Sequence, residues 1–236
     1  YQPLEEDYLQ LQHWTRFRQS KIKMRTALRN QIIGHLDRMF PGLVRPNYKP
    51  EHGGPEKLFA GFWTCQMAQH LIRLCPNPRI LAAMTPEELI ELFHEAGWRM
   101  GPVKAKEIVA FAQQVLLPDQ AYIEARQPLL ELDLKCLDTI DQAIAKADEQ
   151  IEHYLSKTRG QILTNIKGVG PIRAAAFVAG IGNPEHYEHA GQTFKRSGLI
   201  SSRNDSGLHQ DRGAGHRVSK VGDAHLRRAL VEITRG

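Results

Sequence analysis

Residues 161–176 read Gln161-Ile162-Leu163-Thr164-Asn165-Ile166-Lys167-Gly168-Val169-Gly170-Pro171-Ile172-Arg173-Ala174-Ala175-Ala176. A short apolar segment runs into two closely spaced glycines and a proline, after which small residues begin a second helical pattern. This order is typical of a helix-hairpin-helix, in which a glycine-containing turn joins two helices. The stretch predicts a helical C-terminal part built around this hairpin.

The hairpin residues suit an anion. Glycines permit positive φ and carry no Cβ, so backbone N–H groups can approach a phosphate closely, and the following helix directs its positive end at the same place. Such a contact holds the sugar-phosphate backbone and carries no base information. The candidate DNA-binding residues here are Lys167, Gly168, Val169, Gly170 and Arg173. The alternative is a tight turn between packed helices.

Charge distribution agrees with a polyanionic partner. The chain has 236 residues, a formal net charge of +5 and a pI near 9.2. From Ser156 to the C-terminus there are thirteen Lys and Arg against six Asp and Glu, an excess larger than that of the whole chain. We therefore expect nucleic acid to bind the C-terminal third first.

The helical period is lost after Gly180-Ile181-Gly182-Asn183-Pro184, and a Ser/Gly/Arg-rich stretch runs from Phe194 to Lys220. A serine hydroxyl in such a loop could attack a phosphodiester, and nearby arginines would stabilise the charge of the transition state. The candidate phosphate-contacting residues are Arg203, Arg212, Arg217 and Lys220. On chemistry alone, Asp205-Ser206-Gly207 is equally an ordinary turn. A final helix is predicted to begin near Gly222-Asp223-Ala224.

The N-terminal half also has helical patterns. One long helix is predicted over 4–39, ended by Pro41-Gly42, with an apolar face at Phe17, Met24, Leu28, Ile32 and Leu36. Six basic residues crowd its middle, either as a phosphate-binding stripe or as a solvated face: Arg16, Arg18, Lys21, Lys23, Arg25 and Arg29.

Further helices follow a Pro/Gly-rich loop at 44–56. One is predicted to contain Phe59, Phe62, Trp63, Met67 and Leu71 and to end at Pro76 and Pro78. Thr85-Pro86-Glu87-Glu88 is a strong helix start, with Thr as N-cap and Glu at N3. The segment 96–108 joins two helices through a glycine-bounded turn, which we interpret as a plain corner in preference to a phosphate site.

Residues 129–155 have apolar positions at alternating spacings of three and four, which predicts an antiparallel helical pair or a coiled coil. The partner is the N-terminal helix or another subunit. Asp138 and Asp141 lie on this helix, and we interpret them as solvated acids and not as metal ligands. The histidine pairs His186/His189 and His209/His216 have no nearby cysteine and are interpreted as surface residues.

Taken together, the sequence predicts a mainly α fold with weak strand signals. We expect four segments: a long helical arm (1–43), a helical region (44–125), a coiled-coil helix (126–158) and a C-terminal helix-hairpin-helix domain with a serine loop (159–236). Three unpaired cysteines and the lack of a membrane span or signal peptide favour a cytoplasmic, nucleoid-associated protein. The missing initiator Met suggests that the chain begins inside a longer protein.

Several motifs resemble the C-terminal domain of insertion-sequence family 110 transposases, which are bacterial. They are Ile166-Lys167-Gly168-Val169-Gly170-Pro171, Gly198-Leu199, Ser206-Gly207 and Ser219-Lys220-Val221-Gly222-Asp223-Ala224-His225-Leu226-Arg227. Their order and spacing match the family over about residues 160–232. The helix with Arg25-Thr26 and Asn30 is similar to the region that follows the family's N-terminal domain.

This resemblance implies a DNA transposase in which Ser206 is the catalytic nucleophile and DNA is the substrate. It also implies a structured guide RNA and homo-oligomers assembled through the coiled coil. The family's N-terminal RuvC-like domain holds Mg²⁺ on four acids. Glu5, Glu6 and Asp7 do not reproduce that acidic pattern. We therefore expect that this chain lacks the RuvC-like core, binds no cofactor itself and is inactive as an isolated fragment.

Two alternatives stay open. The family's Gly-Leu-x-Pro reads Gly198-Leu199-Ile200-Ser201 here, so Ser201 and Ser202 remain weaker candidates beside Ser206. The whole C-terminal part could also be a non-catalytic helix-hairpin-helix module that only binds DNA. A helical adaptor for other proteins would explain the coiled coil but not the basic C-terminal third.

Overall fold

The computed structural model describes residues 5–44, 58–59, 61–199 and 221–234. These residues form helices and no strand, which confirms the predicted mainly α fold. The elements are α1 (Glu6–Met39), α2 (Gln66–Leu74), α3 (Pro78–Ala83), α4 (Pro86–Glu95), α5 (Pro102–Gln114), α6 (Gln120–Ser156), the 3-10 helix η2 (Arg159–Asn165), α7 (Pro171–Ile181), the 3-10 helix η3 (Pro184–His186), α8 (Ala190–Ser197) and α9 (Ala224–Thr234). None of the described helices combines the length and apolar character that a membrane span needs.

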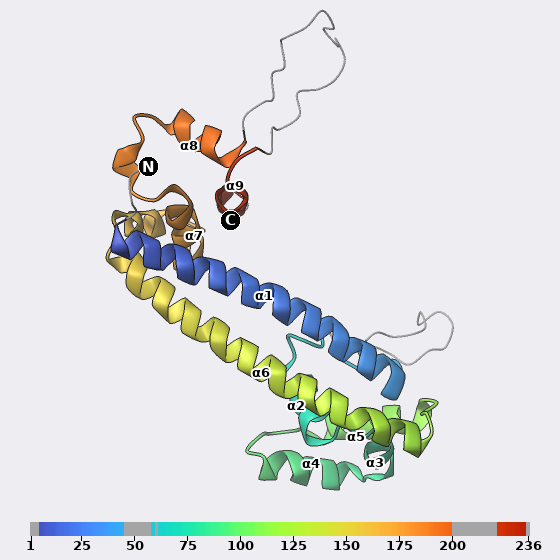
Figure 1. Ribbon diagram of the computed structural model, residues 1–236. Coiled ribbons are helices and arrows are strands. Elements are labelled where there is room, and N and C mark those ends of the chain that lie inside the picture. The colour runs from blue at the N-terminus through green and yellow to red at the C-terminus, as the bar shows by residue number, and fades with distance from the viewer. Residues whose placement is uncertain (1–4, 45–57, 60, 200–220, 235–236) are drawn as a thin grey trace, which may run out of the picture. The chain divides into compact units, whose positions relative to one another are not determined.

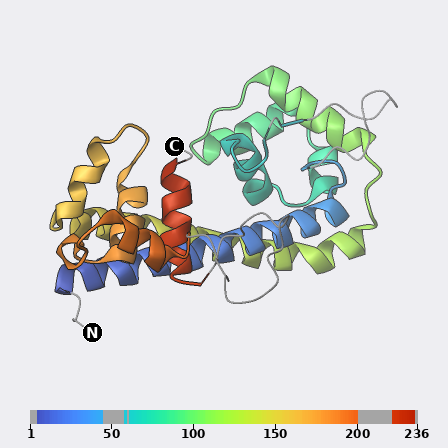
Figure 2. The same ribbon diagram turned by 90° about the horizontal axis from the view of Figure 1, so that it is seen from above.

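The chain forms two compact units. Unit 1 comprises Tyr1–Ile22 and Gln142–Gly236, and unit 2 comprises Lys23–Asp141. Each of the long helices α1 and α6 therefore contributes to both units, whereas the four predicted segments assigned each helix to one segment. Within each unit the two long helices lie side by side in both views (Figures 1 and 2).

Helix α1 confirms the predicted long helix, but its buried face differs from the predicted one. Ile32 and Leu36 are fully buried, whereas Phe17 and Met24 have 40% and 47% of their surface exposed. The reason is geometric: each step of four residues rotates about 40° around a helix, so the apolar pattern leaves the buried face toward its N-terminal end. In unit 1, Leu11 takes the buried position.

Unit 2 contains an apolar core. The C-terminal half of α1, helices α2 to α5 and the N-terminal part of α6 bury Phe93, Leu71, Leu89 and Ile108 among others. The predicted helix with Phe59, Phe62 and Trp63 begins later than expected: α2 starts at Gln66, so these three aromatic residues precede it. Its C-terminal end is followed at once by α3, since Asn77 caps that short helix and Pro78 occupies its first turn.

The predicted start of α4 is confirmed in detail. Thr85 accepts a hydrogen bond from the Glu88 N–H at 3.2 Å, and the Glu88 carboxylate accepts one from the Thr85 N–H at 2.7 Å. This reciprocal pair satisfies two backbone donors that a helix start otherwise leaves free. The predicted glycine-bounded turn to α5 is also present, with Gly97 at φ 81° and Gly101 as N-cap.

Helix α6 begins six residues before the predicted coiled-coil segment and contains Pro128. In unit 2, Arg25 contacts Asp141 at 3.1 Å and His35 contacts Asp133 at 3.5 Å, so α1 and α6 run antiparallel. Supercoiling of the two helices stays a prediction. Asp138 and Asp141 are not merely solvated acids, since the former pairs with Arg73 at 2.6 Å and the latter with Arg25.

Unit 1 is built on α7 and α9. These helices cross so closely that a Cβ on Gly180 would lie 2.9 Å from Leu226 Cβ and 3.1 Å from its Cα. Leu226 is fully buried. The predicted final helix is confirmed, and Asp223 caps it by accepting hydrogen bonds from the N–H groups of His225 and Leu226. Figure 2 shows α9 crossing α1.

Candidate nucleic-acid interface

The hairpin between η2 and α7 is held in place by one buried side chain. Val169 is 4% exposed and belongs to the apolar cluster of unit 1, together with Ile151 and Ala174. On either side of it, Lys167, Gly168 and Gly170 are exposed. The turn therefore presents its backbone to solvent while Val169 fixes its position. The element before the turn is a 3-10 helix, and a helix-hairpin-helix in the strict sense stays a prediction.

Three backbone donors of this hairpin have no acceptor within the described part of the chain. Such unpaired N–H groups belong to Gly168, Gly170 and Ile172. Gly168 has φ 87°, a value that favours glycine, and Gly170 caps α7 without a side-chain hydrogen bond. A Cβ at Gly170 would meet nothing within 4 Å, so this side of the turn is open. Exposed donors at a helix start are suited to an anion.

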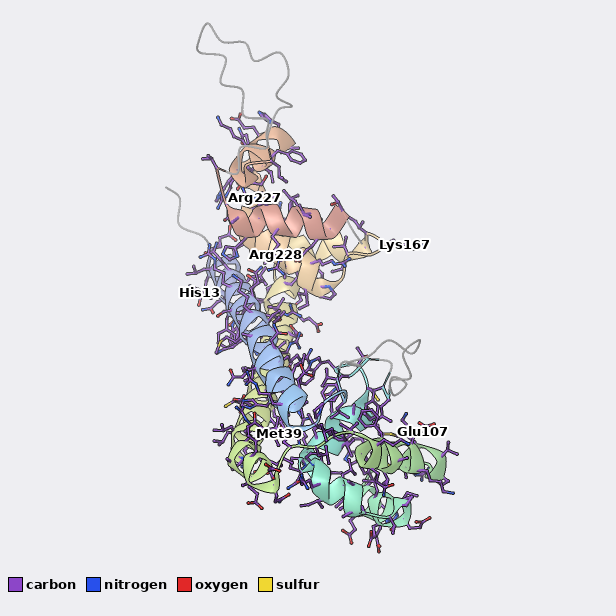
Figure 3. All side chains as sticks on the ribbon, turned by 90° about the vertical axis from the view of Figure 1, so that its right-hand side faces the viewer. His13, Met39, Glu107, Lys167, Arg227 and Arg228 are labelled. Atoms are coloured by element: carbon purple, nitrogen blue, oxygen red, sulfur yellow. The ribbon has the colours of Figure 1, made fainter. Side chains whose placement is uncertain are left out.

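The remaining predicted hairpin contacts have different environments. The Val169 N–H donates to Ile166 O at 3.0 Å, so neither its side chain nor its N–H is open to a phosphate. Arg173 donates through Nη1 to Gly168 O at 2.6 Å and thereby closes the turn. Lys167 has no such bond and lies at the tip of the hairpin (Figure 3). Lys167 is thus the more accessible of the two hairpin cations, Lys167 and Arg173.

The other predicted site residues lie outside the described residues. They are Ser206 with its alternatives Ser201 and Ser202, and the basic residues Arg203, Arg212, Arg217 and Lys220. The structure does describe both flanks of this segment, at Leu199 and Val221.

These flanks are joined by a set of close contacts that we call the clasp (Arg196–Gly198, Val221–Asp223 and Arg227). The Asp223 N–H donates to Arg196 O at 2.8 Å, and Arg227 Nη1 donates to Ser197 O at 3.1 Å. Gly198 has φ 70°, and a Cβ there would overlap the carbonyl oxygen of Val221. The C-terminal end of α8 and the N-terminal end of α9 are therefore in direct contact.

Helix α8 itself was missed by the sequence analysis, which predicted no helical period between Pro184 and the final helix. The helix runs to Ser197 and carries the exposed side chains of Phe194, Lys195 and Arg196. A glycine that follows a last turn with two basic residues, here Gly198 after Lys195 and Arg196, is a usual signal for a helix C-terminus and could have revealed it.

The basic stripe on α1 is largely engaged within the fold. Arg18 forms an ion pair with Asp148 in unit 1, and Arg25 forms one with Asp141 in unit 2. Lys21 lies 5.0 Å from the centre of the Phe17 ring, and Arg29 lies 5.0 Å from that of Trp63. Burial lowers the pKa of Arg29.

Of the six basic residues in the stripe, the two exposed ones are Arg16 and Lys23. This distribution favours a structural role over a continuous phosphate-binding stripe.

Metal ligands do not gather in the described part of the chain. No three His, Cys, Asp or Glu side chains come together there in a way that could hold an ion. The described residues therefore do not fit the Mg²⁺ site that the resemblance assigns to a RuvC-like domain.

Residues 160–235 match the model of a family described as "Transposase IS116/IS110/IS902 family". Over 129 residues the chain is 30% identical to "Probable family 20 transposase" of Pseudomonas aeruginosa, covering 54% of this chain and 37% of that protein. Over 108 residues it is 36% identical to "Insertion element IS116 uncharacterized 44.8 kDa protein" of Streptomyces clavuligerus, covering 44% of this chain and 26% of that protein. The chain thus spans at most 37% of the length of these relatives. No solved structure gives a significant match.

Proposed function

We propose, from the premise that residues 160–235 belong to the IS116/IS110/IS902 transposase family, that this chain is the DNA-handling part of a transposase. The observation that carries the proposal is the set of unpaired N–H groups on the hairpin inside the matched region. These donors would hold a phosphate of the DNA backbone, with Lys167 adding a charge at the tip. Binding of this kind positions DNA without reading its sequence.

Ser206 is the proposed nucleophile. Its hydroxyl oxygen forms a bond to the phosphorus of a phosphodiester, and the bond from that phosphorus to a deoxyribose oxygen breaks. The hydroxyl proton passes to a base or to solvent, and the deoxyribose oxygen leaves with a proton. The clasp supports this assignment, since it joins both flanks of the segment that carries Ser206. Arg203, Arg212, Arg217 and Lys220 are the proposed phosphate contacts.

The test of backbone binding is a salt titration of DNA affinity. Lys167→Ala should weaken binding to all sequences and lower the slope of log K against log salt by about 1. Lys146→Ala is the matched control, because Lys146 is an exposed lysine of the same unit that pairs with Glu149 at 2.8 Å. Equal slopes for the wild type and Lys167→Ala would remove the hairpin from the interface.

The test of chemistry is a denaturation-resistant protein-DNA adduct, sought with the parent protein, its element DNA, guide RNA and Mg²⁺. An adduct that is lost in Ser206→Ala and kept in Ser201→Ala and Ser202→Ala would establish the nucleophile. An adduct that persists in Ser206→Ala would move the role to another residue. Salt-sensitive binding with no adduct from an otherwise active protein would support the alternative, a non-catalytic DNA-binding module.

Copies of the chain are proposed to meet along α6. In unit 2, Leu129, Leu132 and Cys136 are exposed at spacings of three and four residues, on the side of the helix away from its buried positions. Leu132→Glu should lower the mass measured by light scattering, and Lys135→Glu, at a neighbouring exposed position, should leave it unchanged. The guide RNA stays a proposal from the resemblance.

A further inference from the structure

Helix α8 carries an exposed aromatic ring. Of the eight phenylalanines in the chain, Phe17 and Phe194 are exposed, and the other six are buried or half-buried. Phe194 has 46% of its surface exposed. A single exposed apolar side chain is common on protein surfaces and needs no explanation by itself. Its surroundings give this one a more specific meaning.

The turn that carries Phe194 is held rigidly. The carbonyl oxygen of Phe194 accepts hydrogen bonds from the Leu199 N–H at 3.3 Å and from the Ser197 hydroxyl at 2.8 Å. The clasp holds two further carbonyls of this turn, because the Asp223 N–H donates to Arg196 O and Arg227 Nη1 donates to Ser197 O. Because these bonds fix the backbone that carries the ring, binding a partner has to order only the two side-chain torsions of Phe194.

The charge around the ring identifies the kind of partner. Helix α8 contains Lys195 and Arg196 and no acidic residue. Arg196 Nη1 donates to the Tyr187 hydroxyl at 2.7 Å, and that hydroxyl donates to Ile181 O at 2.8 Å. These two bonds hold the guanidinium of Arg196 in place on α8. An exposed aromatic ring next to two cations is complementary to a nucleic-acid strand, which offers flat base faces along a line of phosphates.

We propose that Phe194 stacks on a base that has left the helical stack of the DNA, while Lys195 contacts the adjoining phosphate. This inference rests on the proposed function, because α8 leads directly into the segment with Ser206, seven residues after Leu199. The ring selects DNA that is locally unpaired beside the phosphodiester to be cut. A paired and stacked base offers no free face, so an intact duplex does not make this contact.

Fluorescence and affinity measurements on the full chain test the stacking. The probes are three DNAs of equal length: a duplex, the same duplex with one unpaired 2-aminopurine, and the single strand. Wild type should favour the two unpaired probes and quench the 2-aminopurine. Phe194→Ala should bind them roughly 5- to 150-fold more weakly, with duplex affinity unchanged. Phe194→Trp should keep the preference, and Phe194→Leu should lose it because a leucine has no ring.

Phe17→Ala is the matched control. Phe17 is 40% exposed on α1 in the same unit, also has a lysine over its ring, and should not affect the preference. Circular dichroism confirms that each variant is folded. If Phe194→Ala or Phe194→Leu retains the preference and the quenching, the proposal is wrong.

The failure of this inference is distinguishable from that of the proposed function. Wild type that binds no DNA contradicts both. Wild type that binds with normal salt dependence and no preference for unpaired bases contradicts this inference alone. A variant that changes only self-association, measured by light scattering, would reassign Phe194 to a contact between protein copies.

Discussion

Replacement of Gly198 by alanine tests the clasp most directly. Gly198 has φ 70°, and a Cβ there would overlap Val221 O, lie 2.9 Å from the Val221 carbonyl carbon and 3.0 Å from Arg227 Nη1. The left-handed conformation costs an alanine about 1–2 kcal/mol. Overpacking against a backbone adds about 1–3 kcal/mol. We therefore expect Gly198→Ala to destabilise the clasp by roughly 2–5 kcal/mol.

Gly97 provides a matched control. Its φ is 81°, but a Cβ there would meet nothing within 4 Å, so Gly97→Ala carries only the conformational cost of about 1–2 kcal/mol. The assay is amide hydrogen exchange. The reporters are Leu199 and Asp223 for the clasp, and Trp98, whose N–H donates to Phe93 O at 2.8 Å, for the control.

Exchange at Leu199 and Asp223 should accelerate about 30- to 5,000-fold in Gly198→Ala, and exchange at Trp98 about 5- to 30-fold in Gly97→Ala. Equal acceleration in the two variants would refute the reasoning, because it would mean that the contact with Val221 contributes nothing. Unchanged exchange at Asp223 would show that the clasp does not hold α8 to α9.

Three further predictions concern the rest of the fold. Burial raises the pKa of the Cys75 thiol to about 11, so iodoacetamide at pH 8 should leave Cys75 unmodified in the native protein and modify it after unfolding in denaturant, as read by peptide mass spectrometry. Rapid labelling of Cys75 in the native protein would contradict its burial. Hydrogen bonds from the backbone of Thr85, and secondly from its side chain, lower the pKa of Glu88 in the folded protein. The stabilisation by the ionised Glu88 is therefore fully present above the pKa of the carboxyl in the unfolded chain, and it is lost as the pH falls through the lower pKa of the folded protein. Denaturant unfolding should therefore separate wild type from Glu88→Gln at pH 7 and give equal stabilities at pH 2, and a difference that persists in acid would contradict this. Asp148→Ala should lower the free energy of unfolding by about 0.2–1 kcal/mol, and by less in high salt, because the ion pair with Arg18 is partly exposed. A double-mutant cycle with Arg18→Ala that shows no coupling energy would mean that this ion pair does not stabilise the fold.

The candidate interface was predictable where its chemistry is local. The two glycines, Pro171 and the adjoining basic residues indicate the hairpin from sequence alone, because a tight turn and a helix start depend on neighbouring residues. The structure adds which donors are free. Val169 and Arg173 form hydrogen bonds within the turn and stabilise it. A sequence pattern cannot distinguish such residues from those that face a ligand.

The sequence by itself determined the mainly α fold, the long N-terminal helix, the capping box at Thr85 and the similarity of residues 160–235 to the transposase family model. Each of these follows from local hydrogen bonding, helical period or motif order. Only the tertiary structure decided that Arg18 and Arg25 neutralise acids of α6, that the buried face of α1 turns away from Phe17, and that α8 is bound to α9 by the clasp. These features join residues up to 130 positions apart, and their energies depend on which surfaces meet when the chain packs.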